Sequence, residues 1–306
     1  MTDTTIPAEQ HSGTPGTFRQ PCCALKPQAF TLEAAEQWAL AETSSLSADY
    51  FRLTLFMYID YVVQHVPGER KTRYTIRLAQ AENYGLACCL TAMLPDADHD
   101  LVGDDSREIL KNRRFRDDID RTALIDLVIG HASAAANREV TLQQIRREKY
   151  ALRSRLFADE AAAVLRRKGL SAIKGKKPCI HVIGATAGMI GALLESCFEV
   201  TATDMAADVV AKNLGGVTVV EERENERLIE AADLVIITGM TLHNRTLPTL
   251  IEAAKTHNTS TAIWAITGRN FGHYYTENGV DCVISDPSPF LLLPGPAKIG
   301  IWRREI

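Results

Sequence analysis

A glycine-rich turn near residue 184 carries the residue types best suited to hold a ligand. Gly184, Gly188 and Gly191 follow the apolar run 180–183, which predicts a short buried strand. Glycine lets a ligand approach the backbone closely, and the helix that follows directs free N–H groups and a partial positive charge at that ligand. The spacing is GxxxGxxG and differs from the dinucleotide pattern GxGxxG. The alternative is that the glycines only let a helix pack tightly on a strand.

Asp204 ends the next predicted strand, about twenty positions beyond Gly184. Nucleotide-binding folds carry an acidic residue at this place, where it holds ribose hydroxyls. Thr186, inside the turn, is a further candidate contact for a cofactor. Asp204 is equally consistent with a solvated strand end or a helix cap, so this residue alone does not decide between binding and structure.

A second polar segment follows the apolar run 234–237, which predicts a fully buried strand. Its candidate cofactor contacts are Thr238, Gly239, Thr241 and Asn244. Asn244 or Thr246 could instead cap the next helix, but capping needs only one or two polar side chains. His243 is a candidate ligand or acid/base group, or a surface histidine. The density of polar groups favours a ligand site.

Strands and helices alternate from about residue 178 onward, which predicts a Rossmann-like, doubly wound parallel sheet. A short helix is expected at 207–214. Ligands of such sheets bind at the carboxyl ends of the strands. The expected strand ends carry Gly184, Asp204, Thr238 and Thr267. Their loops should therefore converge, which is the strongest physical argument for a binding site.

The chain is predicted to have three parts: a flexible tail at 1–28, an α+β cap domain at 29–170, and the Rossmann-like domain at 171–306. The cap should contain a helix from Thr31 to about Thr43 and a largely buried helix from Ser47. Further elements are expected as a β-hairpin at 74–90 and helices at 106–112, 121–137 and 141–167. The basic residues of the last segment are interspersed with acidic ones, which indicates a solvated face.

Two residues of the cap are candidates to close the pocket over a ligand. Tyr84 belongs to the predicted hairpin, and Asn137 to the end of a predicted helix. With His243, they are the three candidate catalytic residues. A structural hydrogen bond is the alternative role for Asn137, because a buried polar side chain must find partners.

Composition excludes several classes of function. The 306 residues carry a formal net charge of −4 and show no basic stripe, so nucleic acid is not an expected partner. No apolar run of about 18 residues predicts a membrane span, and the first residues do not resemble a secretory signal. We therefore expect a cytoplasmic protein with a small-molecule substrate, and a homodimer is the oligomeric state to be tested. The seven cysteines include no CxxC pair, and the adjacent Cys22 and Cys23 remain without an assigned role.

Three segments resemble a known family: IHVIGATAGMIG, ADLVIITGMTLHNRTLPTLIEAA and NGVDCVISDP. They are similar to the Rossmann-like proteins described as "putative heavy-metal chelation" (domain of unknown function 364), over about residues 178–290. The most specific positions are Thr238, Gly239, Thr241, Leu242, Asn244 and Thr246. Residues 74–90 and 132–137 resemble, more weakly, the enolase N-terminal-like domain that often precedes it. Thr267-Gly268-Arg269 stands where the family often has Gly-Pro-Ser, so this part of a family-like pocket is expected to differ.

Three functions remain open at this stage. The first is an enzyme that binds an adenosyl ligand, foremost S-adenosylmethionine, for group transfer or cyclisation, because such chemistry needs mainly positioning and water exclusion. The second, which the resemblance implies, is binding of a metal or a metal complex, for instance through His243, His273 and Cys282. An NAD-binding oxidoreductase is the third, and an inactive scaffold is the simplest alternative.

Overall fold

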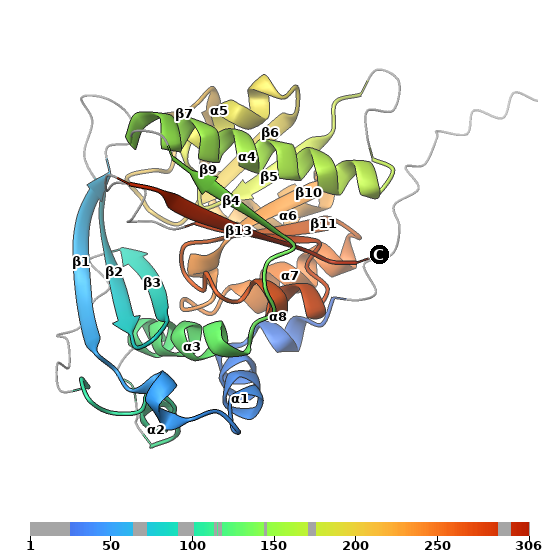
Figure 1. The fold of residues 1–306 in the computed structure, drawn as a ribbon. Coiled ribbons are helices and arrows are strands. Elements are labelled where there is room, and N and C mark those ends of the chain that lie inside the picture. The colour runs from blue at the N-terminus through green and yellow to red at the C-terminus, as the bar shows by residue number, and fades with distance from the viewer. Residues whose placement is uncertain are drawn as a thin grey trace, which may run out of the picture.

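The computed structural model describes residues 25–63, 72–90, 101–112, 115, 118–143, 146–170, 176–286 and 295–305. An eight-stranded sheet with the order β4-β13-β12-β11-β10-β5-β6-β9 dominates the fold (Figure 1). A three-stranded antiparallel sheet, β1-β2-β3, belongs to the N-terminal half of the chain. The protein therefore has the α/β fold that the sequence predicts, with a Rossmann-like sheet and a smaller α+β portion before it.

The large sheet is built from short apolar segments. Its strands are β4 (Arg138–Leu142), β5 (Cys179–Ile183), β6 (Glu199–Asp204), β9 (Val220–Glu221), β10 (Leu234–Thr238), β11 (Ser260–Ala265), β12 (Cys282–Ser285) and β13 (Ala297–Arg303). From β12 to β9 all neighbours are parallel, whereas β13 and β4 add two antiparallel strands at one edge. Every residue of β11 is buried, as expected for a strand with helices on both faces of its sheet.

Helices cover both faces of this sheet (Figure 1). They are α4 (Arg146–Arg167) and α5 (Ala187–Glu195) on one face, and α6 (Asn225–Ala231), α7 (Leu247–Thr256) and α8 (Gly272–Glu277) on the other. Side chains alternate along β5: Ile180 and Val182 pack into the α4–α5 core, and Ile183 packs into the opposite core. The two cores fix the strand ends at which a ligand would bind.

The smaller part packs a sheet against a helix. Its elements include α1 (Leu32–Glu42), β1 (Leu55–Val63), β2 (Thr72–Gln80), β3 (Tyr84–Leu90), α2 (Ser106–Asn112) and α3 (Asp118–Ala132). The helix α3 lies directly on β3 at Gly85, where an added Cβ would meet the Ala123 carbonyl oxygen at 2.1 Å. Any side chain at residue 85 would therefore push the helix off the sheet.

Buried polar contacts join the small sheet to the loop after β11. The Asp126 carboxylate accepts hydrogen bonds of 2.8 Å from the amides of Leu86 and Asn270. The Thr267 hydroxyl accepts one of 2.8 Å from the Cys88 amide. These bonds tie α3, β3 and the β11 loop together, so the small sheet is held at the carboxyl edge of the large one.

The structure confirms several predicted elements and corrects others. Thr31 caps α1 through a hydrogen bond from the Ala34 amide, and the hairpin is present as β2 and β3. The helix predicted from Ser47 is wrong: a 3₁₀ turn, η2 (Ala48–Phe51), leads into β1. The physical reason is the β-branched and aromatic run 58–63, which favours a strand that pairs with β2 over a helix.

Other corrections concern segment ends and sheet membership. The helix expected at 121–137 ends at Ala132, and β4 follows and pairs with β13. The part of the chain predicted as cap thus supplies an edge strand, and also α4, to the large sheet unit. No helix forms at 207–214, where the chain turns into β7 (Asn213–Leu214) and β8 (Val217–Thr218). The expected tail and Cys22–Cys23 lie outside the described residues.

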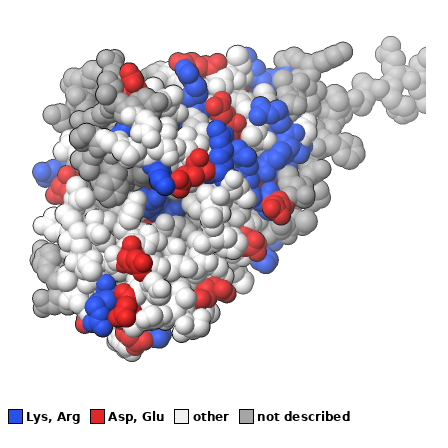
Figure 2. Space-filling model, viewed as in Figure 1, with Lys and Arg blue, Asp and Glu red and all other residues white. Residues whose placement is uncertain are grey.

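Several charged side chains of the described residues form ion pairs. Figure 2 shows Lys and Arg interspersed with Asp and Glu on the face viewed. Glu160 of α4 binds both Arg138 and Arg303, and Asp281 binds both Lys168 and Arg304. Among the described residues, no helix combines the length and apolar character that a membrane span needs.

Candidate functional site

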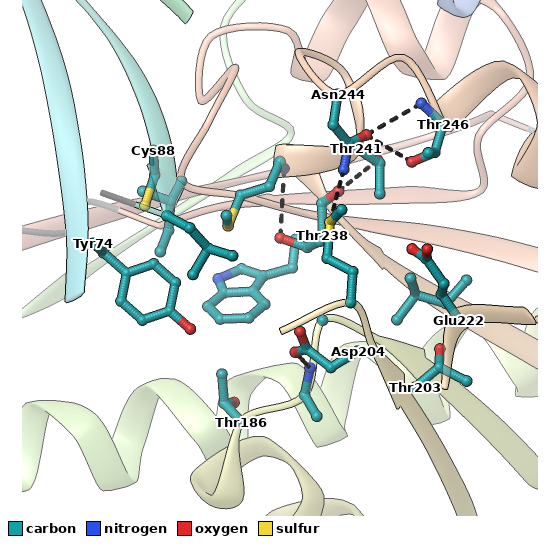
Figure 3. A pocket seen from close by; sticks show the side chains of 18 of the residues that line it. Tyr74, Cys88, Thr186, Thr203, Asp204, Glu222, Thr238, Thr241, Asn244 and Thr246 are labelled. Carbon is teal, nitrogen blue, oxygen red and sulfur yellow. Dashed lines mark hydrogen bonds between the residues drawn. The ribbon is translucent and has the colours of Figure 1, made fainter. Parts of the chain in front are cut away.

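A cavity of about 730 Å³ lies at the carboxyl ends of β5, β6, β10 and β11, between the large sheet and the small sheet (Figure 3). Its volume is in the range of small-molecule sites, about 300–1,000 Å³. Figure 3 shows Thr186 and Asp204 on one side of the cavity, the loop with Thr238 on another, and Tyr74 across from them. The loops at these strand ends therefore converge, as the sequence predicts.

The turn between β5 and α5 forms one wall. Gly184 has a φ of +86°, and an added Cβ would meet the Thr238 side chain at 2.7 Å, so both backbone shape and space require glycine. Thr186 is the N-cap residue of α5, but its side chain makes no capping hydrogen bond. Its buried hydroxyl has no hydrogen-bond partner among the described residues. The helix thus begins at the cavity wall with its first N–H groups, next to a buried hydroxyl that has no hydrogen-bond partner among the described residues.

Asp204 braces this turn from the end of β6. One carboxylate oxygen accepts a hydrogen bond of 3.0 Å from the Ala185 amide, and the other accepts one of 2.8 Å from the Ala206 amide. A carboxylate oxygen can accept more than one hydrogen bond, so such a group can bind ligand hydroxyls as well as backbone amides. Asp204 therefore has a structural role and lines the cavity at the same time.

The loop after β10 is organised by its own polar side chains. The Thr241 hydroxyl donates a hydrogen bond of 2.7 Å to the Thr238 carbonyl. Asn244 Oδ1 accepts bonds of 3.1 Å from the Thr246 amide and 2.7 Å from its hydroxyl. Gly239 lies against the β11 loop, because an added Cβ would be 2.2 Å from the Thr267 carbonyl oxygen. These contacts hold the loop in a fixed shape, with Thr238, Thr241 and Asn244 on the cavity wall.

An arginine from α4 completes the opposite wall. Arg153 is only 7% exposed, and its Nη1 donates a hydrogen bond of 2.7 Å to Asp286. The Trp264 indole N–H donates to the same Asp286 oxygen at 2.9 Å. The sequence analysis assigned this stretch of basic residues to a solvated face, and Arg153 corrects that assignment. The charge pattern of α4 does not reveal it, because Arg153 stands in a run of basic and acidic residues that also includes the exposed Arg155.

The small sheet contributes an apolar wall with one phenol. The side chains are Val62, Tyr74, Cys88 and Leu90, and Met240 and Ile266 continue the surface. Burial raises the pKa of Tyr74, and the nearby Asp204 carboxylate raises it further. Tyr74 therefore stays a neutral phenol that can donate or accept a hydrogen bond. A wall of this kind keeps water away from a bound ligand.

Comparison with known proteins identifies part of the chain. Residues 170–263 match the model of DUF364, a family described as "Putative heavy-metal chelation". The sequence similarity to this family covers these residues, which are about a third of the chain. The match spans β5 to β11 and includes both cavity loops that the sequence analysis singled out. It confirms the resemblance, while the enolase-like likeness of the N-terminal part stays a prediction.

Solved structures of DUF364 proteins resemble the chain in fold. One protein of unknown function from Desulfitobacterium hafniense DCB-2 has 12% identity and a TM-score of 0.50, over 89% of this chain and 98% of its own. Another protein of unknown function, from Pyrococcus horikoshii, has 13% identity and a TM-score of 0.49, over 89% of this chain and 99% of its own. No curated protein matches the chain in sequence. At such low identity, the similarity to the Desulfitobacterium hafniense protein supports a shared fold but gives no information on function.

Most predicted cofactor contacts within residues 170–263 meet at the cavity. They are Gly184, Thr186, Gly188, Asp204, Thr238, Thr241 and Asn244. Gly191 lies one turn further along α5 and is not part of the lining, and an added Cβ there would meet no atom within 4 Å. Gly239 is buried between two loops and acts through their packing.

The three candidate catalytic residues do not line the cavity. Tyr84 pairs with Gln80 at the turn end of the hairpin, where its hydroxyl contacts Arg269, whereas Tyr74 pairs with Leu90 at the open end. The two ends are about 20 Å apart along the strand. The hairpin tyrosine at the cavity is therefore Tyr74, which the sequence analysis missed.

Asn137 and His243 have other surroundings. The Asn137 side chain accepts a hydrogen bond of 2.6 Å from the Arg303 amide, beside β13 and away from the cavity. This is the structural alternative that the sequence left open. His243 is 8% exposed and is buried in the loop after β10, whereas the next residue, Asn244, faces the cavity. Adjacent side chains of the loop thus point to different sides.

The suggested metal ligands are not assembled. Within the described residues, no group of three or more His, Cys, Asp or Glu side chains is placed to hold a metal ion. Cys282 is buried in β12, where burial raises the pKa of its thiol to about 12. His273 lies on α8 next to the Trp38 ring. The described residues alone would therefore give a metal at the cavity fewer than three His, Cys, Asp or Glu ligands.

Proposed function

We propose that the cavity binds an adenosine-containing small molecule, foremost S-adenosylmethionine, and that the protein uses it for group transfer or cyclisation. The observation that carries the proposal is the place of Asp204. Its carboxylate ends β6 on the cavity wall, beside the Gly184 turn and the N-terminus of α5. Ribose hydroxyls bind a carboxylate at this position of a Rossmann-like fold.

The chemistry would depend on positioning. A carbon bound to a sulfonium is already activated for attack. The protein must therefore align the nucleophile, exclude water and give the thioether leaving group room to depart. The apolar wall around Tyr74 and Leu90 serves the exclusion of water. Thr238 and Thr241 supply hydroxyls and carbonyls that can orient a polar substrate group. Tyr74, as a neutral phenol on the cavity wall, can hold a hydrogen bond to an amine or carboxylate.

A nicotinamide dinucleotide fits this turn less well. In GxGxxG the second glycine lets the backbone approach the pyrophosphate, and that position carries Thr186 here. Its side chain prevents the close backbone approach of a pyrophosphate, although its hydroxyl can still donate to a single anionic group. An NAD-dependent oxidoreductase is therefore the weaker proposal.

The family description favours a second function, the binding of a metal complex. The cavity is large enough for a chelated ion, and cavity carboxylates such as Asp204 and Glu222 are hard donors that could bind one face of it. In this case the bound species would be the chelate, with the protein supplying few of the metal ligands. A homodimer remains a further, separate prediction.

Isothermal titration separates these functions. S-adenosylmethionine, S-adenosylhomocysteine, 5′-methylthioadenosine, NAD and divalent metal salts are titrated in turn into the purified chain. We expect the adenosyl compounds to bind with micromolar dissociation constants and NAD to bind more weakly. Binding of NAD or of metal ions without any adenosyl binding would overturn the proposal. Incubation with S-adenosylmethionine, followed by analysis for methylthioadenosine and homocysteine derivatives, then distinguishes cyclisation from transfer.

A further inference from the structure

The buried guanidinium of Arg153 has unused binding capacity on the cavity wall. Of its N–H groups, Nη1 is bound to Asp286, while the buried Nε has no hydrogen-bond partner among the described residues. Its side chain is 9% exposed, so solvent satisfies little of it. A buried donor without a partner is unfavourable, and an acceptor on a ligand removes that penalty. The guanidinium stacks over the rings of Tyr150 and Trp264, which fixes its plane.

Asp286 lies near a second guanidinium besides that of Arg153. It also stabilises the charged form of Arg269, whose pKa burial lowers to about 10. Asp286 therefore acts on two guanidinium groups, of which only Arg153 is hydrogen-bonded to it in the described structure. The second arginine is turned away toward Tyr84, so Arg153 is the one that lines the cavity.

The N-terminus of α5 lies next to this arginine. Gly188, in its first turn, approaches α4 so closely that an added Cβ would be 2.9 Å from the Ser154 hydroxyl. The unpartnered Thr186 hydroxyl and the uncapped N–H groups of α5 therefore adjoin the Arg153 side of the cavity. An arginine, a hydroxyl and a helix N-terminus are the donors that carboxylates and phosphates prefer.

We infer that Arg153, Thr186 and the N-terminus of α5 form an anion subsite, which binds the carboxylate or phosphate of the ligand whose ribose Asp204 holds. This inference rests on the proposed function for the ribose end, and it extends it by naming the charge of the other end. A ligand with one hydroxyl-rich end and one anionic end would span the cavity. Adenosine without an anionic group would leave the Arg153 donor unfilled.

The test compares adenosyl compounds that differ in this group. S-adenosylhomocysteine carries a carboxylate, AMP carries a phosphate, and 5′-methylthioadenosine carries neither. Each is titrated by calorimetry into the wild type and into Arg153→Lys. Lysine keeps a charge beside Asp286 but lacks the Nε donor and the planar fork. We expect at least one anionic compound to bind the wild type about tenfold or more tightly than methylthioadenosine, consistent with a hydrogen bond to a charged group.

The variant should lose that preference. Binding of the anionic compound should fall about tenfold in Arg153→Lys, while methylthioadenosine binding stays unchanged. The anion that binds more tightly, carboxylate or phosphate, identifies the anionic group that the subsite prefers. The control is Arg121→Lys, since Arg121 pairs with Glu36 at a similar distance, 2.7 Å, outside the cavity lining. It should bind all three compounds as the wild type does. A folded Arg153→Lys with an unchanged preference, or a wild type without any preference, overturns the inference.

Failure of the two proposals can be told apart. Methylthioadenosine binding without an anion preference leaves the adenosyl proposal intact and overturns the subsite. If none of the adenosyl compounds binds, the adenosyl proposal fails. Inorganic phosphate is then titrated into the protein while tryptophan fluorescence is measured, with Trp264 as the reporter. A change that Arg153→Lys abolishes supports the subsite, and no change in the wild type overturns it.

Discussion

The carboxylate of Asp204 accepts a hydrogen bond of 3.0 Å from the backbone amide of Ala185, across the turn that joins β5 to α5. The bond links the end of β6 to the glycine turn that follows the neighbouring strand, β5. This bond orients the carboxylate and also fixes the shape of the turn, so the positions of the carboxylate and the turn depend on each other. Changes at Asp204 should therefore affect both ligand binding and the local stability of the turn.

Asp204→Asn should weaken binding of an adenosyl ligand about 10- to 100-fold, because an amide offers one acceptor oxygen where the carboxylate offers two. One of the two backbone amides loses its acceptor, and the free energy of unfolding should fall by about 1–2 kcal/mol. Calorimetric titration and urea denaturation measure the two effects. Glu199→Gln, at the exposed opposite end of β6, is the control and should change neither. Wild-type affinity in Asp204→Asn would remove the ribose contact from the proposal.

Gly184→Ala and Gly191→Ala should act in opposite directions. Alanine at 184 must adopt a φ of +86° with its Cβ 2.7 Å from Thr238, so we expect a loss of about 2 kcal/mol or more and impaired ligand binding. Alanine at 191 meets no atom within 4 Å inside α5, and should stabilise the protein by about 0.5–1 kcal/mol. Denaturant midpoints measure both. A destabilised Gly191→Ala with reduced affinity would return Gly191 to the list of binding residues.

The sequence predicts the convergence of loops better than it predicts the remaining walls. Gly184, Asp204 and Thr238 follow buried parallel strands, and in a parallel sheet all carboxyl ends lie at one edge. Local patterns therefore suffice to bring them together. This explains why seven of the nine predicted cofactor contacts line the cavity.

The other walls depend on long-range packing. Whether Tyr74 or Tyr84 reaches the cavity depends on how α3 and the β11 loop orient the hairpin, through Asp126 and Thr267. No periodicity within the hairpin encodes that orientation. Arg153 is similar: its burial results from Asp286, far along the chain, and the charge pattern of α4 alone suggests a solvated residue.

His181 should make stability fall in mild acid. Burial lowers the pKa of His181 to about 4, in β5 between Thr201 and Asn225. Because the folded state holds the neutral imidazole, its stabilising effect is complete above about pH 6.5 and is lost as the pH falls toward 4, by up to about 3 kcal/mol. His181→Gln should reduce that slope in urea denaturation between pH 7 and 4. His257→Gln, at the end of α7, should keep the wild-type slope. An unchanged slope in His181→Gln would contradict this account.

Asp126→Asn should loosen the attachment of the small sheet. The two carboxylate oxygens accept from different amides, those of Leu86 and Asn270. Asparagine can replace only one of these acceptors, and its own NH₂ would face the other amide. We expect a loss of about 1–3 kcal/mol, because a buried donor is left without a partner. Asp118→Asn, which alters a partly exposed pair with Arg245, is the control and should cost about 1 kcal/mol or less.

The same variant tests whether the joint also shapes the cavity. The hairpin residues Tyr74 and Cys88 line the cavity, and β3 is held to the β11 loop by the bonds around Asp126 and Thr267. If the attachment fixes this wall, Asp126→Asn should weaken adenosyl binding at temperatures where the variant is still folded, as circular dichroism verifies. A destabilised variant with wild-type affinity would show that the large-sheet loops bind the ligand without help from the small sheet.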